Sequence, residues 1–252
     1  MTKRLEGKIC FITGATRGIG EVASRHFASH GAKVALAGRG TEAGEAIAES
    51  IRDAGGEAFF VQVDVTDPES VEKGIAATVE KFGGLHVIYN NAGGSSAKDG
   101  LVTETPLDVF WDTMKLELFG TWLCCRYGIP ELIKSGGGSI INSASIMGAM
   151  GVPKRDAYSA AKGGIIALTR SMAVEYAQHK VRANVLVPGA VATDRVLKFF
   201  ASEPHLEDQK KAYLLGMSEP IDVANAALYL ASDESCRMTG HMLPVDSGIL
   251  IS

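Results

Sequence analysis

The sequence contains little cysteine and no long hydrophobic run. Its four cysteines show no C-x-x-C spacing, so neither a disulfide framework nor a thiolate metal site is indicated, and reduced thiols are expected. Residues 1–14 reach an apolar run only at 9–12, which is too short for the hydrophobic region of a signal peptide. The longest uncharged stretch, residues 135–153, is rich in glycine, serine and asparagine, unlike a membrane span. These absences predict a soluble, cytoplasmic protein.

An excess of positive charge is also absent. The 252 residues carry 25 lysines and arginines against 29 aspartates and glutamates, a formal net charge of −4, so no electrostatic footprint for nucleic acid or for an anionic membrane is present. His26 and His30 lie four residues apart, but no third ligand is near them, and no metal is expected. The hydrophobic fraction of 46% supplies an ample core, and the length favours a single domain over residues 1–252.

Short apolar runs alternate with helix-type segments along the whole chain. The expected strands are residues 8–13, 33–37, 58–63, 85–89, 139–143, 181–187 and 241–245. The expected helices follow the first strand and occupy residues 42–54, 67–82, 105–134, 156–178 and the segment from 218 onward. This alternation predicts an α/β fold, a doubly wound, Rossmann-like parallel sheet of about seven strands with helices on both faces. Residues 190–217 have no assigned structure and are interpreted as a substrate-loop insertion within the domain.

A glycine-rich turn follows the first predicted strand and leads directly into a helix. The candidate cofactor-binding residues of this turn are Gly14, Thr16, Arg17, Gly18, Ile19 and Gly20. Glycines permit a sharp turn and a close backbone approach to a pyrophosphate, and the helix N-terminus offers free N–H groups to it. A phosphate loop of the nucleotide-hydrolase type is excluded, because no Gly-Lys-Ser/Thr follows. The alternative is a purely structural turn, and the strand before it and helix after it argue against that.

The end of the second predicted strand carries no acidic residue. A carboxylate there accepts hydrogen bonds from the adenosine ribose of NAD and repels the 2′-phosphate of NADP. Here the position is Gly38, followed by Arg39, and Arg17 is available from the first turn. Two guanidinium groups without a carboxylate favour NADP, with NAD as the alternative. The alternative for Arg39 is a solvated surface arginine.

Tyr158 and Lys162 lie four residues apart on a predicted helix and therefore share one face. A free tyrosine titrates near pH 10, and a neighbouring ammonium favours the phenolate and lowers that value. Ser145, at the end of the fifth predicted strand, can donate a hydrogen bond to a substrate oxyanion. Without other signals, Tyr158 and Lys162 would be interpreted as a pair on the surface of a helix. Ser145 and the glycine-rich turn favour a catalytic pair instead. The predicted chemistry is proton transfer by Tyr158.

The order and spacing of four signals resemble the short-chain dehydrogenase/reductase family. They are the Thr13–Gly20 turn, Asn90-Asn91-Ala92-Gly93, Ser145 and Tyr158-x-x-x-Lys162. The resemblance implies hydride transfer between NADP(H), or NAD(H), and a secondary alcohol or ketone, with Ser145, Tyr158 and Lys162 catalytic. It implies further cofactor contacts by Asp64, Val65, Asn91, Ala92, Gly93, Tyr158, Lys162, Pro188, Gly189, Val191 and Thr193, with Asn90 and Thr13 tying the central strands together. It also implies a homotetramer or homodimer built on the helices at 106–134 and 156–178.

The chain departs from this family pattern at one catalytic position. Where most members have an asparagine that holds a water next to the lysine, counting back from Ser145 gives Glu117. A carboxylate near Lys162 would offset part of the effect of the ammonium on Tyr158, so we expect a raised working pH or a weakened turnover. Alternatively, Glu117 points elsewhere and only the helix backbone matters.

Substrate recognition is expected in three segments, residues 94–102, 146–155 and 190–217. Their apolar side chains suggest a hydrophobic or cyclic alcohol or ketone. Four basic residues in them leave an anionic substrate open: Lys154, Arg155, Arg195 and His205. A second class of function stays open as well, a catalytically weak dinucleotide-binding sensor or scaffold, because of Glu117.

Overall fold

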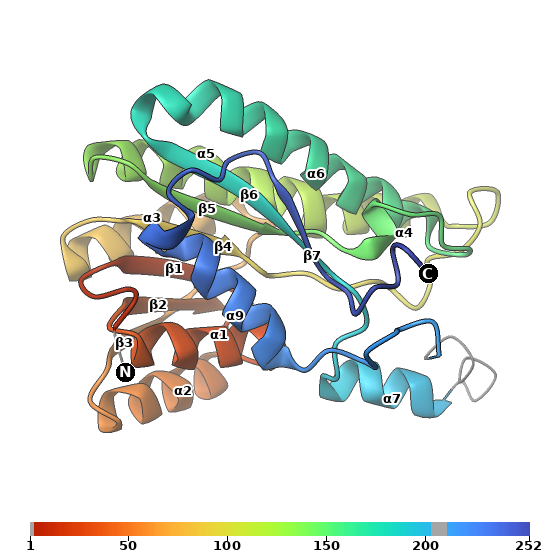
Figure 1. The fold of residues 1–252 in the computed structure, drawn as a ribbon, viewed down its shortest axis with the longest axis horizontal. Helices are drawn as coiled ribbons and strands as arrows, with labels where there is room; N and C mark the ends of the chain where they lie inside the picture. The colour runs from red at the N-terminus through yellow and green to blue at the C-terminus, as the bar shows by residue number, and fades with distance from the viewer. Residues whose placement is uncertain (1–2, 203–210) are drawn as a thin grey trace.

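The computed structural model of the protein describes residues 3–202 and 211–252. Seven of its strands pair in parallel in the order β3-β2-β1-β4-β5-β6-β7 (Figure 1). The strands are β1 (Ile9–Thr13), β2 (Lys33–Gly38), β3 (Glu57–Gln62), β4 (Val87–Asn90), β5 (Gly138–Ser143), β6 (Val181–Pro188) and β7 (Met242–Val245). The doubly wound parallel sheet expected from the sequence is therefore confirmed.

Helices cover both faces of this sheet (Figure 1). Their bounds are α1 (Gly18–Ser29), α2 (Thr41–Asp53), α3 (Pro68–Phe82), α4 (Leu107–Met114), α5 (Gly120–Lys134), α6 (Asp156–Tyr176), α7 (Asp194–Ser202) and α9 (Pro220–Ala231). Helices α1 and α9 pack against each other on one face, and α3 packs against α5 on the other. Within the described residues, no helix is both long and apolar enough to cross a membrane.

Strand β1 shows why the strands are apolar throughout. Cys10 and Ile12 belong to the core on the α1 and α9 side, whereas Phe11 belongs to the core on the α3 and α5 side. All three side chains are fully buried, because successive side chains of a strand point to opposite faces and both faces are covered.

The order of the strands reverses between β1 and β4. From β1 the chain proceeds outward to β2 and β3, and from β4 it proceeds outward in the other direction to β7. Connections leave the carboxyl ends of β1 and β4 in opposite directions, which opens a crevice where open α/β sheets bind their ligands. The segments that follow β1, β4, β5 and β6 meet at this edge.

Two expectations about individual segments need correction. The helix predicted at 105–134 is interrupted by a π-helical segment, Lys115–Phe119, between α4 and α5. Apolar periodicity did not reveal it, because a single widened turn leaves the pattern on either side intact. Residues 190–217, left unassigned, contain α7, while residues 203–210, with His205, lie outside the described part of the chain.

Candidate active site

The glycine-rich turn leaves space for a ligand at the start of α1. Gly14 has a φ of +63°, and a Cβ atom added to it would lie 2.8 Å from the Cα of Ala92. A Cβ atom at Gly20 would overlap the carbonyl oxygen of Gly14. No side chain caps the N-terminus of α1, since Arg17 makes no capping hydrogen bond. The close backbone approach and uncapped N–H groups fit a dinucleotide pyrophosphate.

The end of β2 lies beside this turn. A Cβ atom at Gly38 would lie 2.9 Å from the Cγ2 of Thr16, so the space of a ribose-binding carboxylate is taken by the turn itself. Arg17 and Arg39 are both exposed. Asp64 follows β3; burial raises the pKa of its carboxyl, but hydrogen bonds from Thr66 together with the charges of Arg39 and Lys115 lower the pKa overall.

Thr13 joins the first turn to the segment that follows β4. Its hydroxyl oxygen accepts hydrogen bonds from the backbone N–H groups of Asn91, at 3.1 Å, and Ala92, at 3.0 Å. The side-chain amide of Asn91 donates in return to the carbonyl oxygens of Thr13 and Gly14. The Asn91 side chain therefore braces the glycine-rich turn, a use that the sequence did not indicate.

A second polar link crosses the buried centre of the sheet. The Asn90 amide donates to the side-chain oxygen of Asn142 at 2.8 Å, and the Asn142 amide donates to the hydroxyl of Thr169 at 2.9 Å. All three side chains are buried. This network links β4, β5 and α6, which holds the helix that carries Tyr158 and Lys162; the side-chain oxygen of Asn90 is buried and accepts no hydrogen bond from the described residues.

Ser145, Tyr158 and Lys162 come together beyond the end of β5. The Lys162 ammonium donates to the carbonyl oxygen of Ser143 at 2.8 Å and lies 5.4 Å from the centre of the Tyr158 ring. The side chain of Ser145 lies beside Tyr158 and lowers the pKa of its phenol. Lys162 is 3% exposed, so solvent screens its charge weakly at the phenol.

Glu117 points into this cluster from the π-helical segment. Its carboxylate is fully buried, with Oε2 2.7 Å from Nζ of Lys162, and Oε1 accepts the backbone N–H of Gly94. A Cβ atom at Gly93 would overlap the same carboxylate. The sequence left open whether Glu117 approaches Lys162 or points elsewhere. In the structure its carboxylate contacts Lys162.

The charges around Tyr158 act in opposite directions on its pKa. Burial raises the pKa of the phenol, Lys162 lowers it, Glu117 raises it again, and Arg195 and the hydrogen bond with Ser145 lower it; the net direction is upward. Burial lowers the pKa of Lys162, but Glu117 and Tyr158 outweigh this and raise it. Lys162 therefore stays protonated beside the phenol.

The structure also identifies Asp99, a residue that the sequence analysis missed. Its buried carboxylate accepts the backbone N–H groups of Ala157, at 3.2 Å, and Tyr158, at 3.0 Å, at the start of α6. It thereby satisfies N–H groups that a helix start leaves without partners. No local signal could have revealed this cap, because it comes from a loop 58 residues before Ala157.

The remaining predicted cofactor contacts lie after β6. Gly189 pairs with β7, and Val191 forms a parallel bridge with Ser218. The Cγ2 of Thr193 lies 3.3 Å from where a Cβ atom of Gly18 would be. The start of α7 therefore reaches the glycine-rich turn, so Val191 and Thr193 flank the crevice.

The basic residues near the crevice are engaged by the protein. Arg195 donates to the carbonyl oxygen and the hydroxyl of Ser95. Arg155 donates to the carbonyl oxygen of Ser96 at 3.2 Å and lies 5.8 Å from the centre of the Phe199 ring. These contacts tie α7 and the start of α6 to the loop after β4.

Sequence matches to known proteins extend over nearly the whole chain. A family model described as enoyl-(acyl carrier protein) reductase matches residues 14–250. The 2,5-dichloro-2,5-cyclohexadiene-1,4-diol dehydrogenase LinX of Sphingobium indicum is 37% identical over 251 residues, 98% of this chain and 98% of that protein. Secoisolariciresinol dehydrogenase of Forsythia intermedia is 34% identical over 100% of this chain and 92% of its own.

A solved structure extends the likeness to three dimensions. A short-chain type dehydrogenase/reductase from Mycobacterium marinum matches with a TM-score of 0.92 and 31% identity, over 99% of this chain and 98% of that one. The fold and the matches define an oxidoreductase that acts on CH–OH groups. The chain belongs to the short-chain dehydrogenase/reductase family, whose members use NAD(P).

Proposed function

We propose that the protein transfers a hydride between NADP(H) and a cyclic, largely hydrophobic secondary alcohol or ketone, with Tyr158 as the proton donor and acceptor. The observation that carries the proposal is the approach of the buried Lys162 ammonium to the Tyr158 ring, 5.4 Å from its centre, with Ser145 beside the same phenol. A buried cation of this kind stabilises a phenolate, which is the state that a general base requires.

The bound nicotinamide supplies the hydride chemistry. Ser145 donates a hydrogen bond to the substrate oxygen and stabilises the negative charge that develops there. Tyr158 takes the hydroxyl proton in alcohol oxidation and returns it in ketone reduction. Lys162 orients the phenol and stabilises its ionised form, while the Ser143 carbonyl and the Glu117 carboxylate fix the position of the ammonium.

The choice of NADP rests on charge at the end of β2. Gly38 offers no carboxylate, and packing against Thr16 excludes one without a shift of the turn. Arg17 and Arg39 are exposed, and neither forms an ion pair with a carboxylate within the described residues, although the Asp64 carboxylate interacts electrostatically with Arg39. The two guanidinium groups could bind a ribose 2′-phosphate through charge-assisted hydrogen bonds.

An apolar substrate is favoured over an anionic one. Leu197, Phe199 and Leu214 are 49%, 39% and 62% exposed in the segments expected to bind substrate. Arg155 and Arg195, the cations that could hold an anion, are already bonded to the loop after β4. One relative is named for a dichlorocyclohexadienediol, which supports a cyclic alcohol for this chain.

We further propose that the protein assembles with copies of itself through α4, α5 and α6. An apolar hollow of about 630 Å³ on this surface is lined by Trp111, Leu118, Phe119, Trp122 and Leu168, among others. Trp111 is 66% and Trp122 is 40% exposed, and a large exposed apolar patch of this kind marks an interface. A second copy would cover both rings, as expected for a homodimer or homotetramer.

We place the protein in the cytoplasm. All four of its cysteines are free, and Cys10, Cys124 and Cys125 are buried thiols whose pKa values burial raises. A protein whose four cysteines are all free thiols is typical of a reducing compartment.

The test is a panel of cyclic and open-chain ketones, with NADPH and NADH oxidation followed by absorbance and cofactor binding measured separately. We expect turnover with cyclic ketones, and Tyr158→Phe should lower kcat by about 10²–10⁴-fold while leaving cofactor affinity within a few-fold. Tight cofactor binding with no turnover on any substrate would instead support a sensor or scaffold. Unchanged turnover in Tyr158→Phe would remove the proposed role of this residue.

A further inference from the structure

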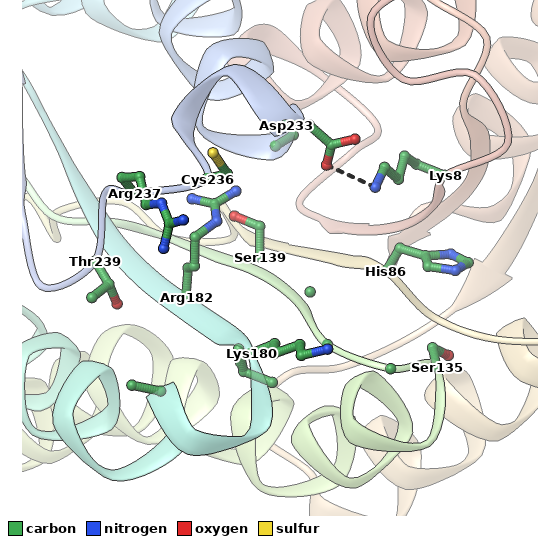
Figure 2. A pocket seen from close by; sticks show the side chains of 16 residues that line it. Lys8, His86, Ser135, Ser139, Lys180, Arg182, Asp233, Cys236, Arg237 and Thr239 are labelled. Carbon is green, nitrogen blue, oxygen red and sulfur yellow. Dashed lines mark hydrogen bonds and ion pairs between the residues drawn. The ribbon is translucent and has the colours of Figure 1, made fainter.

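A second cavity opens at the edge of the sheet opposite the candidate active site. It has a volume of about 650 Å³ and lies at the amino ends of β5 and β6 (Figure 2). Its floor is the segment Gly136–Ser139, and Lys180 and Arg182 border it from the start of β6. Cys236 and Arg237 close another side. Nothing in the proposed hydride transfer uses this cavity, whose volume suits a small ligand.

Positive charge accumulates in this cavity although the protein as a whole is negative. Its lining contains Lys8, Lys180, Arg182 and Arg237 but a single carboxylate, that of Asp233. Asp233 is engaged by Lys8, with the Lys8 ammonium 2.9 Å from its oxygen (Figure 2).

The neighbouring acidic residue is also engaged elsewhere. Glu234 accepts two hydrogen bonds of 2.7 Å from Arg4. Both carboxylates near the cavity are thus taken by cations of the N-terminal segment. Among the described residues, Lys180, Arg182 and Arg237 have no carboxylate within ion-pair distance.

Arg182 is held in place by backbone carbonyl groups, with no carboxylate of the described residues within ion-pair distance. Its guanidinium donates to the carbonyl oxygens of Leu230, at 2.8 Å, Met238, at 3.2 Å, and Ser232, at 3.3 Å. Burial lowers its pKa, and the negative groups nearby do not fully offset that effect. A desolvated, preoriented guanidinium of this kind is suited to binding an anion.

The C-terminus of α9 explains the position of one of these cations. The C-terminus of α9 presents carbonyl oxygens to Arg182, and a helix end carries about half a negative charge. That partial charge accounts for the position of Arg182. The helix end does not explain the positions of Lys180 and Arg237. The Lys180 side chain extends into the cavity, below both arginines in the view of Figure 2.

We propose that this cavity binds a small polyanion, a molecule with two or more phosphate or carboxylate charges, through Lys180, Arg182 and Arg237. Three cations without an ion-pair partner among the described residues, gathered in one cavity, favour a ligand with more than one negative charge. The floor of the cavity is closely packed, because a Cβ atom at Gly138 would meet the carbonyl of His86 and one at Gly137 would meet Lys180. The ligand therefore contacts side chains at the walls and does not penetrate the sheet.

Cys236 provides a direct reporter for this site. It lines the cavity and is exposed, whereas Cys10, Cys124 and Cys125 are buried. Alkylation by the neutral reagent iodoacetamide therefore reads out the cavity selectively. A bound anion blocks access of the reagent to the thiol.

The experiment measures the rate of Cys236 alkylation in the intact protein against increasing inorganic pyrophosphate or citrate, with potassium chloride at equal ionic strength as the reference. We expect a saturable decrease of about fivefold or more. Each titration gives a dissociation constant for the anion, and these constants are compared among variants. This constant does not depend on the intrinsic reactivity of the thiol. The pyrophosphate and citrate arms distinguish a phosphate ligand from a carboxylate ligand.

Two substitutions test the assignment. Arg237→Gln and Lys180→Asn should each raise the dissociation constant about tenfold or more. Asparagine is chosen because Lys180 has a φ of +59°, which asparagine tolerates. Lys73→Gln, an equal charge change at an exposed site on α3, is the control and should bind as the wild type does. The proposal is overturned if neither anion slows alkylation beyond the chloride reference, or if both substitutions leave the affinity unchanged. Neither result depends on hydride transfer.

Discussion

The ammonium of Lys162 lies 2.7 Å from Oε2 of Glu117, and both side chains are buried. A neutral amide at this position would leave the full charge of Lys162 acting on Tyr158. The carboxylate instead neutralises part of that charge and raises the pKa of the phenol. The pair therefore fixes the lysine in place while weakening its electrostatic effect on the proton-transferring group.

The first prediction concerns the pH dependence of alcohol oxidation. Oxidation requires the Tyr158 phenolate, so the rate increases with pH as the phenol ionises. Because Glu117 raises the pKa of Tyr158, Glu117→Asn should lower it and move the rising limb of kcat/KM to lower pH. Ketone reduction needs the protonated phenol, so its kcat/KM declines as the pH rises. In Glu117→Asn this decline should also move to lower pH.

Two companion variants separate charge from shape. Glu117→Gln keeps the length of the side chain and an acceptor for the Gly94 N–H, and should shift the profile in the same direction. Glu175→Gln removes an exposed carboxylate from α6 and should not shift it. Superimposable profiles for all variants would show that the charge of Glu117 does not act on the reacting proton.

The second prediction concerns cofactor choice. Arg39→Gln should raise the dissociation constant for NADPH about tenfold or more, because a charge-assisted hydrogen bond to the 2′-phosphate is lost. NADH lacks this phosphate and serves as the matched control in the same variant. Fluorescence titration measures both affinities. Equal weakening of the two cofactors would indicate a structural role for Arg39 and remove the argument for NADP.

The third prediction concerns the cap on the helix that carries Tyr158. Asp99→Ala leaves the N–H groups of Ala157 and Tyr158 without their acceptor and should lower the free energy of unfolding by about 1–3 kcal/mol. Asp99→Asn keeps one acceptor oxygen and should cost less. Lys98→Ala, at the exposed neighbouring position, is the control. Urea denaturation provides the measurement, and equal stability of Asp99→Ala and Lys98→Ala would contradict the capping role.

The fourth prediction concerns assembly. Trp122→Glu places a charge in the apolar surface of α5 and should convert the proposed dimer or tetramer to a smaller species in light scattering. Lys73→Glu changes the charge of α3, away from that surface, and should leave the assembly intact. A wild-type protein that is monomeric at high concentration would refute the proposed interface.

Much of the fold followed from local patterns. The apolar run at β1 and the glycines after it predicted a strand, a tight turn and a helix, because backbone freedom and side-chain alternation act over a few residues. The spacing of Tyr158 and Lys162 placed both on one helix face for the same reason. The π-helical turn at Lys115–Phe119 escaped prediction, since one widened turn does not disturb the apolar pattern on either side of it.

By itself, the sequence determined the parallel sheet, the place of the cofactor turn and the serine, tyrosine and lysine of the candidate site, since each rests on short-range spacing. Only the tertiary structure decided that Glu117 turns toward Lys162, that Asp99 caps the helix of Tyr158, and that Lys180, Arg182 and Arg237 line one cavity at the opposite edge of the sheet, where the single carboxylate, Asp233, pairs with Lys8. These relationships join residues far apart along the chain. Their distances are set by how strands and helices pack, which no local rule of spacing contains.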